Sequence, residues 1–300
     1  MPSPTLSLGL ANFSAAAPDD GWGGLIERAR VADRAGIDRV VVVDHVVMGE
    51  HLEAYDGGRF PTGPGGNWLE PMTVLGVIAG ATERVRLSTG ILIAARRGPA
   101  VLAKAAATLD VLSGGRLDLG VGVGWQREEY EAAGLAFEER GDLLDETLAV
   151  CRALWAGGPT SYRSDRLRFD GVWCEPRPVQ PGGVPIWVSG RLNRRTLARI
   201  ARFGDGWIPW GEHIGAVEAH VAEVHEALAA AGRDPAAFGV RGQLPAGRGE
   251  DLGGAMEPVG RMVSAGVTDF NLGLRLPDDH AEAEDLLASA VAAFRTAIEG

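Results

Sequence analysis

Arg39-Val40-Val41-Val42-Val43-Asp44-His45 is a run of branched apolar residues that ends in two polar side chains. Apolar residues at successive positions, rather than at alternate ones, are typical of a strand that is buried on both faces of a parallel sheet. Residues 39–43 are therefore a predicted strand, and the fold class depends on how often such a strand, followed by a helix, recurs along the chain.

Seven further segments repeat this arrangement. Short apolar runs at 5–10, 85–91, 116–121, 185–189, 206–208, 239–244 and 269–274 alternate with stretches of helical periodicity. Eight consecutive strand–helix units favour an α/β protein with one closed (β/α)8 barrel, the TIM barrel. An open doubly wound sheet is the main alternative, but no dinucleotide fingerprint follows the first strand.

The 300 residues suit one barrel domain, 1–300, better than two smaller domains. Two segments interrupt the rhythm of strands and helices. Residues 48–68 are rich in glycine and proline and are predicted to be a loop. Residues 157–184 contain four prolines and short alternating pieces, which predict an insertion with a hairpin between the fourth helix and the fifth strand.

The charge and composition exclude several classes of partner. Lys and Arg number 29 against 40 Asp and Glu, so the net charge is −11 and repels nucleic acid and anionic membranes. Two cysteines form no disulfide framework, and neither a signal peptide nor a bilayer-spanning run is evident. We therefore expect a cytoplasmic protein with no nucleic acid or membrane partner.

In such a barrel the active site lies at the C-terminal ends of the strands. Asp44 and His45 stand at one such end and are the candidate catalytic residues. Histidine exchanges a proton near neutral pH, and a carboxylate can orient it or bind a ligand. Neighbouring strand residues point to opposite sides, so the two side chains need not touch. The alternative is that His45 only packs in the loop.

Two further strand ends carry candidate cofactor-binding residues. The run Gly120-Val121-Gly122-Val123-Gly124-Trp125 lacks the dinucleotide spacing, and its glycines instead suggest close approach of a backbone or a flat ring. For Gly120, tight packing of the fold is an equal alternative.

The other strand end is the run Ser189-Gly190-Arg191, which precedes a predicted helix. The free N–H groups at the start of this helix and the arginine form a candidate anion site, and Arg194 and Arg195 add positive charge nearby. Ordinary capping by Asn193 is the alternative.

A metal site is not expected. The acidic residues Asp118, Glu128, Glu129 and Glu131 lack histidine partners at metal-ligand spacing. His213, His220 and His225 are predicted to be solvated.

Nine stretches together resemble the luciferase-like monooxygenase superfamily, and within it the coenzyme F420-dependent oxidoreductases. The resemblance runs from Leu8 to about Trp210 and lies in the order of the stretches. They are Val40-Val41-Val42-Val43-Asp44-His45, Gly58-Arg59-Phe60-Pro61, Trp68-Leu69-Glu70-Pro71, Leu102-Ala103-Lys104-Ala105-Ala106-Ala107-Thr108-Leu109-Asp110, Leu112-Ser113-Gly114-Gly115-Arg116-Leu117, Gly120-Val121-Gly122-Val123-Gly124-Trp125, Glu175-Pro176-Arg177-Pro178-Val179-Gln180, Pro185-Ile186-Trp187-Val188-Ser189-Gly190 and Gly204-Asp205-Gly206-Trp207.

The resemblance implies a homodimeric oxidoreductase that holds coenzyme F420 across the strand ends and transfers hydride to or from a small organic substrate. It implies a non-proline cis peptide at Gly90-Ile91 beneath the ring. Trp125 stands where some sugar-phosphate dehydrogenases of the family carry a catalytic glutamate. The resemblance therefore does not imply that this chain acts on the substrate of those enzymes. The candidate cofactor-binding residues are Asp44, Gly90, Ile91, Gly122, Gly124, Trp125, Ser189, Gly190 and Arg191. An FMN-dependent monooxygenase and a cofactor-binding protein without turnover are the alternatives.

Overall fold

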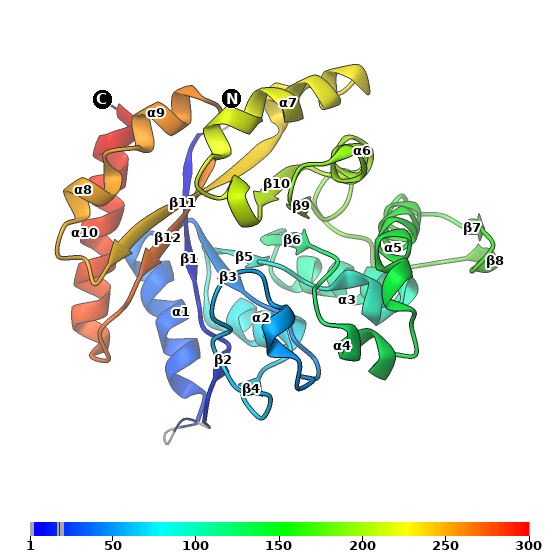
Figure 1. Ribbon diagram of the computed structural model, residues 1–300, viewed down its shortest axis with the longest axis horizontal. Coiled ribbons are helices and arrows are strands. Elements are labelled where there is room, and N and C mark those ends of the chain that lie inside the picture. Colours follow the sequence, from blue (N-terminus) through cyan, green and yellow to red (C-terminus); the bar gives the residue numbers. More distant parts are fainter. Residues whose placement is uncertain (1–2, 17, 19–20, 300) are drawn as a thin grey trace.

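In the computed structural model, which describes residues 3–16, 18 and 21–299, eight parallel strands close into a barrel (Figure 1). Neighbours around the barrel follow the order β1-β12-β11-β10-β9-β6-β5-β3, so barrel strands that follow one another along the chain lie side by side in space. The predicted TIM barrel is therefore confirmed. The barrel strands are β1 (Thr5–Gly9), β3 (Arg39–Val42), β5 (Arg86–Thr89), β6 (Leu117–Val121), β9 (Ile186–Gly190), β10 (Gly206–Pro209), β11 (Gly239–Gly247) and β12 (Asp269–Leu274).

Helices surround the barrel and cover the outer face of its strands (Figure 1). They are α1 (Gly23–Ala35), α2 (Pro71–Ala81), α3 (Pro99–Leu112), α4 (Arg127–Ala132), α5 (Arg140–Trp155), α6 (Arg194–Phe203), α7 (Val217–Ala230), α8 (Leu252–Met256), α9 (Val259–Ser264) and α10 (His280–Glu299). Short 3₁₀ turns lie at η1 (Leu52–Ala54), η2 (Ala94–Arg97), η3 (Phe137–Glu139), η4 (Gly211–His213) and η5 (Pro235–Ala237).

Local sequence explains where these helices begin and end. Gly36 follows α1 with φ of 88°, a left-handed conformation that glycine adopts without strain. Pro71 occupies the first turn of α2, where its missing N–H is not needed, and the Glu70 carboxylate accepts a hydrogen bond from Thr73 N. The segment between β11 and β12 forms two helices rather than one, because Pro258 interrupts the hydrogen-bond ladder between α8 and α9.

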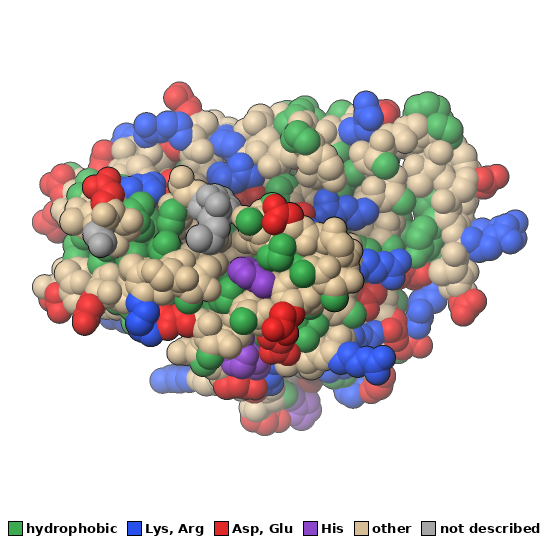
Figure 2. Space-filling model, turned by 90° about the horizontal axis from the view of Figure 1, so that it is seen from above, with side chains coloured by type: hydrophobic (Ala, Val, Ile, Leu, Met, Phe, Trp, Pro, Cys, Tyr) green, Lys and Arg blue, Asp and Glu red, His purple; other side chains and the backbone are tan. Residues whose placement is uncertain are grey.

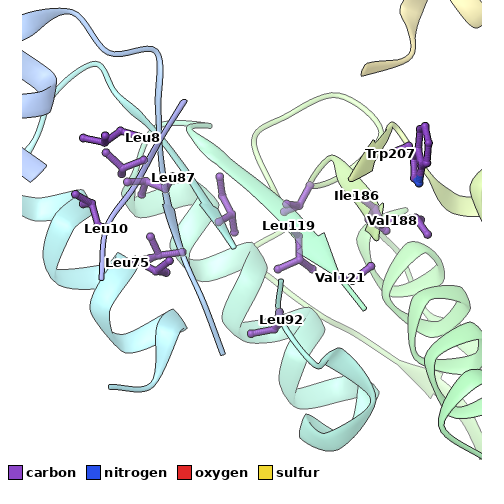
Figure 3. Close-up of a cluster of buried hydrophobic side chains, with 14 of the residues drawn as sticks. Leu8, Leu10, Leu75, Leu87, Leu92, Leu119, Val121, Ile186, Val188 and Trp207 are labelled. Atoms are coloured by element: carbon purple, nitrogen blue, oxygen red, sulfur yellow. The ribbon is translucent and has the colours of Figure 1, made fainter. Parts of the chain in front are cut away.

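The apolar core lies between the strands and the surrounding helices. Figure 3 shows Leu8, Leu87 and Leu119 projecting from their strands among the side chains of this cluster. Leu75 of α2 packs in the same cluster and, like these three, has no exposed surface beyond 1%. Burial of such side chains is the main favourable contribution to folding, at roughly 1.5–3 kcal/mol for each one.

The interior of the barrel, unlike its outer face, contains charged side chains. Arg39 of β3 contacts Asp118 of β6 at 3.0 Å and also pairs with Asp269 of β12, although these strands are not neighbours. Asp269 also binds Arg241 of β11 at 2.5 Å. These four residues are almost completely buried, so the contacts cross the barrel interior and join strands from opposite sides.

Gly120 of β6 is required by close packing of the barrel. A Cβ added at this position would lie 1.9 Å from the carbonyl oxygen of Thr89 in β5. The backbones of these two strands approach too closely for any side chain, so the packing alternative accounts for this glycine.

The two segments that interrupt the barrel have little regular structure. Within 157–184 the expected hairpin is present as β7 (Thr160–Arg163) and β8 (Arg168–Val172), which extend away from the barrel beyond α5 (Figure 1). Residues 48–68 form a loop as expected, but they also contain η1 and end in β4 (Asn67–Trp68), which pairs with β2 (Phe13–Ser14).

The surface is mixed in charge on the face that Figure 2 shows, where acidic and basic side chains are interspersed. No large patch of a single sign of charge is visible on this face, although the chain as a whole has a net charge of −11. Among the helices of the described residues, none combines the length and the apolar character that a bilayer crossing requires.

Candidate active site

His45 lies just beyond β3 at the C-terminal end of the barrel, and a buried carboxylate from another element binds it. The Nδ1 atom of His45 is 3.1 Å from Oε2 of Glu129, which α4 presents. The other carboxylate oxygen of Glu129 accepts a hydrogen bond from Val46 N at 3.1 Å and contacts Arg96. Because an ionised carboxylate only accepts hydrogen bonds, this contact places the proton of a neutral His45 on Nδ1.

Asp44 is also buried, but its side chain points away from His45 toward two arginines. Arg97 binds both carboxylate oxygens of Asp44 at 2.7 and 2.9 Å, and Arg96 approaches Oδ2 at 3.2 Å. Ile93 N donates to the same oxygen at 2.8 Å. Burial works to raise the pKa of Asp44, but the hydrogen bonds and charge of Arg97 and Arg96 outweigh it and hold the pKa below its ordinary value.

The side chains of Asp44 and His45 do not pair with each other but are linked indirectly through a chain of ion pairs. Arg96 contacts Asp44 with one terminal nitrogen and Glu129 with the other. Arg97 extends the chain to Glu70 at 2.8 Å. The expectation that the two neighbours need not touch is therefore confirmed. The arrangement fixes the ring of His45 and leaves Asp44 with protein partners on both of its oxygens.

The strand segment that follows β5 has the expected backbone. The peptide bond between Gly90 and Ile91 is cis, as the sequence resemblance implied. Two glycines after β6 make room for this segment. A Cβ at Gly122 would lie 2.9 Å from Ile91 Cδ1, and one at Gly124 would lie 2.8 Å from Ile93 Cδ1.

Trp125, directly after these glycines, joins an aromatic cluster around His45. Its ring centroid lies 5.8 Å from that of His45, and the rings of Phe60 and Trp68 lie 5.3 and 4.7 Å from His45. The indole Nε1 of Trp125 is buried and has no hydrogen-bond acceptor within the described part of the chain. A buried donor of this kind indicates a place where a ligand can supply the acceptor.

The candidate anion site after β9 contains fewer arginines than the sequence suggested. Asn193 caps α6 by accepting from Arg195 N and Thr196 N, both at 3.0 Å, so the capping alternative describes this helix end. Arg195 is turned to Asp142, away from the barrel mouth. Arg191 is the arginine of the group that reaches toward the neighbouring loops, where it binds Asp56 and Glu212, each at 2.7 Å.

Two other expectations about polar residues need correction. His213 is buried rather than solvated, because it packs edge-on against Trp207 and lies 4.4 Å from the ring of His220. Glu129, which the sequence placed only among rejected metal ligands, is the partner of His45. The described residues contain no cluster of three or more side chains arranged to hold a metal ion.

Comparison with known proteins identifies relatives across most of the chain. The sequence pattern of the family described as luciferase-like monooxygenase matches residues 7–293. An uncharacterized protein of Mycobacterium tuberculosis is 33% identical over 226 residues, which cover 75% of this chain and 77% of that protein. The F420-dependent hydroxymycolic acid dehydrogenase of the same organism is 31% identical over 234 residues, covering 77% of this chain and 61% of the dehydrogenase.

A solved structure has the same fold over almost the entire length. It is an F420-dependent secondary alcohol dehydrogenase in complex with an F420-acetone adduct, with a TM-score of 0.75. The match covers 98% of this chain and 99% of the dehydrogenase at 20% sequence identity. An identity this low supports the shared barrel fold and carries no further conclusion.

Proposed function

Because the chain belongs to the luciferase-like monooxygenase family, we propose that it is an F420-dependent oxidoreductase that transfers hydride between the deazaflavin and a small organic substrate. The choice of cofactor is supported by the hydroxymycolic acid dehydrogenase, a relative at 31% identity whose name specifies F420. When bound, the deazaflavin supplies or accepts the hydride, and a side chain of the protein must donate or accept the accompanying proton.

The observation that carries this proposal is the contact between His45 and Glu129 at the C-terminal end of the barrel. With Glu129 engaging Nδ1, Nε2 is the ring atom left to exchange a proton with a substrate oxygen or nitrogen. General acid–base catalysis of this kind contributes typically 10²–10⁴-fold to a rate. His45 is the proposed catalytic residue, and Asp44 acts as a positioning residue through Arg96.

The residues around His45 fit a flat ring with polar edges. Trp125 offers a buried indole N–H without a partner among the described residues, and a ring carbonyl or nitrogen would satisfy it. Gly122 and Gly124 add no side chains of their own beside Ile91 and Ile93, respectively. Gly90 and Ile91 would then support the ring.

The anionic part of the cofactor is assigned to Ser189, Gly190 and Arg191. Gly190 ends β9 beside the barrel mouth, and its carbonyl is fixed by a hydrogen bond from Trp207 Nε1 at 3.0 Å. Arg191 supplies a charge that matches a phosphate group. Its two carboxylate partners must rearrange when such a group binds.

A titration of the purified protein separately with F420 and with FMN tests this proposal. We expect tighter binding of F420, because the named relative uses it and because Arg191 can bind the longer anionic tail. Arg191→Ala should weaken F420 binding, whereas His45→Ala should change the dissociation constant only a few-fold. Micromolar binding of FMN with no detectable F420 binding would instead indicate the FMN-dependent monooxygenase. Binding without turnover of any candidate substrate would indicate a carrier.

A further inference from the structure

The loop of residues 48–68, here called the capping loop, covers His45. Phe60 of this loop is buried, and its ring centroid lies 5.3 Å from that of His45. Tyr55 packs against Phe60 at 5.2 Å and against Trp125 at 5.4 Å. His45 itself is only 8% exposed. Because this loop packs on His45, its movement would expose the proposed catalytic ring to a substrate.

The capping loop is fastened to the opposite side of the barrel mouth by one carboxylate. Asp56 Oδ2 lies 2.7 Å from Nη1 of Arg191, and Asp56 Oδ1 accepts a hydrogen bond from Trp210 Nε1 at 3.1 Å. At the adjacent Gly57, a Cβ would lie 2.8 Å from Trp210 Cη2, so the loop packs tightly at this point. The fastening therefore joins the loop to the strand ends of β9 and β10.

The same arginine is the proposed ligand of the cofactor's anionic group. In the fastened arrangement Arg191 is matched by two carboxylates, Asp56 and Glu212, so the local charge is negative. A phosphate group would meet repulsion from both and would find the guanidinium engaged. The side chains of all three residues are at least 43% exposed, so water screens the pairs and an anion can displace them at small cost.

We propose that Asp56 is a latch that competes with the anionic group of the cofactor for Arg191, so that cofactor binding releases the capping loop from His45. This inference rests on the proposed function for the identity of the anion. The coupling must be reciprocal, because a ligand that favours the released loop binds more tightly when the loop is already released. Weakening the latch should therefore strengthen cofactor binding.

The first measurement is affinity. Asp56→Asn removes the charge of the latch and keeps an oxygen that can accept from Trp210. We expect this variant to bind F420 about two- to fivefold more tightly than the wild type, a small factor because exposed ion pairs are weak. Glu212→Gln is the matched control, since it removes the second carboxylate from Arg191 but leaves the capping loop fastened. It should also tighten binding.

The second measurement follows the loop itself. Arg59 is exposed and precedes the buried Phe60, so trypsin cleavage after Arg59 reports release of the capping loop. The fragment that ends at Arg59 is quantified by mass spectrometry. We expect severalfold faster cleavage in Asp56→Asn without any ligand, wild-type rates in Glu212→Gln, and faster cleavage of the wild type on saturation with F420. Inorganic phosphate at matched ionic strength tests the anion alone.

The outcomes separate the latch from the proposed function. If neither F420 nor FMN binds, the proposed function fails, while cleavage of Asp56→Asn and the response to phosphate still decide the latch. Wild-type cleavage in Asp56→Asn, or unchanged or weaker F420 binding by that variant, would overturn the latch even in a protein that binds F420. Equal acceleration in Asp56→Asn and Glu212→Gln would also overturn it, because charge alone would then explain the effect.

Discussion

Arg96 is the residue that makes two separate carboxylates act as one unit. Asp44 and Glu129 are 0% and 1% exposed at their side chains, and a buried carboxylate is stable only with a cationic or hydrogen-bonding partner. Arg96 lies between them and contacts both. A change at Asp44 therefore reaches His45 by way of Arg96 and Glu129, although Asp44 and His45 are adjacent in the chain.

Glu129→Gln tests whether this unit sets the tautomer of His45. Glutamine keeps the shape of the side chain, but its oxygen is drawn to Val46 N and its amide then faces Nδ1 as a donor. We expect the proton of neutral His45 to move from Nδ1 in the wild type to Nε2 in the variant. Nitrogen-15 NMR of histidine-labelled protein measures the two ring nitrogens without a substrate.

Glu128→Gln is the matched control on the neighbouring position of α4, and it should leave the tautomer of His45 unchanged. Removal of the carboxylate altogether in Glu129→Ala should destabilise the protein by about 3–5 kcal/mol, because Arg96 would lose a buried partner. An Nδ1–H signal for His45 that persists in Glu129→Gln would show that Glu129 does not orient the ring.

The sequence predicted one half of this unit and missed the other. Asp44 and His45 could be recognised because they directly follow a buried strand, and the barrel places such residues at the active-site end. Glu129 lies 84 positions away from His45, beside two other glutamates, Glu128 and Glu131, from which its sequence context does not distinguish it. Only the direction in which α4 leaves the strand turns Glu129 inward, and no local pattern carries that direction.

At the scale of elements, β12 holds the barrel together through Asp269. This carboxylate binds Arg39 of β3, Arg241 of β11, and the hydroxyls of Thr5 and Ser7 in β1. Burial works to raise the pKa of Asp269, but the two arginines and the hydroxyls lower it from 3.8 to about 2. Because the folded pKa is depressed, the stabilisation is complete above pH 3.8 and is lost as the pH falls toward 2.

Asp269→Asn should therefore remove a pH-dependent part of the stability. The shift from 3.8 to about 2 corresponds to about 2.5 kcal/mol. The variant also leaves the buried Arg39 and Arg241 with less counter-charge. We therefore expect the free energy of unfolding at neutral pH to fall by about 3–5 kcal/mol in total. Denaturant unfolding between pH 7 and 2.5 measures both quantities, with Asp285→Asn at an exposed position as the control. A difference between wild type and Asp269→Asn that stays constant over this range would contradict the assignment.

The elements themselves were largely predictable because each barrel unit repeats one pattern, a buried strand followed by a helix. The exceptions occur where the pattern gives no signal. The two residues of β4 are too few to show alternation, and they form a strand only because β2, far away in sequence, pairs with them. The charged interior was also not expected, since Arg39 stands at the start of an otherwise apolar run and Asp118 was considered only as a metal ligand and rejected.

At the scale of the whole molecule, α2 and α3 present an outer face that is unusually poor in charge for a chain with net charge −11. Val77, Val101 and Leu112 on this face are 53%, 69% and 74% exposed. Beside them run the glycines of α2, Gly76 and Gly80, where an added Cβ would meet nothing within 4 Å. The chain's own packing does not require these glycines, although each costs a helix roughly 0.5–1 kcal/mol relative to alanine.

A second copy of this chain is the partner that such a face fits. Two acidic molecules repel each other least where both are uncharged, and protruding valines beside bare glycines can interlock when the same face meets itself. The face also borders a groove of about 680 Å³ whose walls include Arg96, Arg97 and Glu129. We therefore propose that the protein is a homodimer and that pairing shields the charges behind His45 from water.

Introduction of glutamates at two exposed valines of this face tests the homodimer. Light scattering should give twice 31.5 kDa for the wild type and 31.5 kDa for the double variant Val77→Glu/Val101→Glu, because pairing would force four carboxylates into an apolar contact. Val172→Glu, at an exposed valine of the hairpin, is the control and should keep the wild-type mass. A wild-type mass of one chain would refute the homodimer, and a dimer that survives the double variant would move the interface away from α2 and α3.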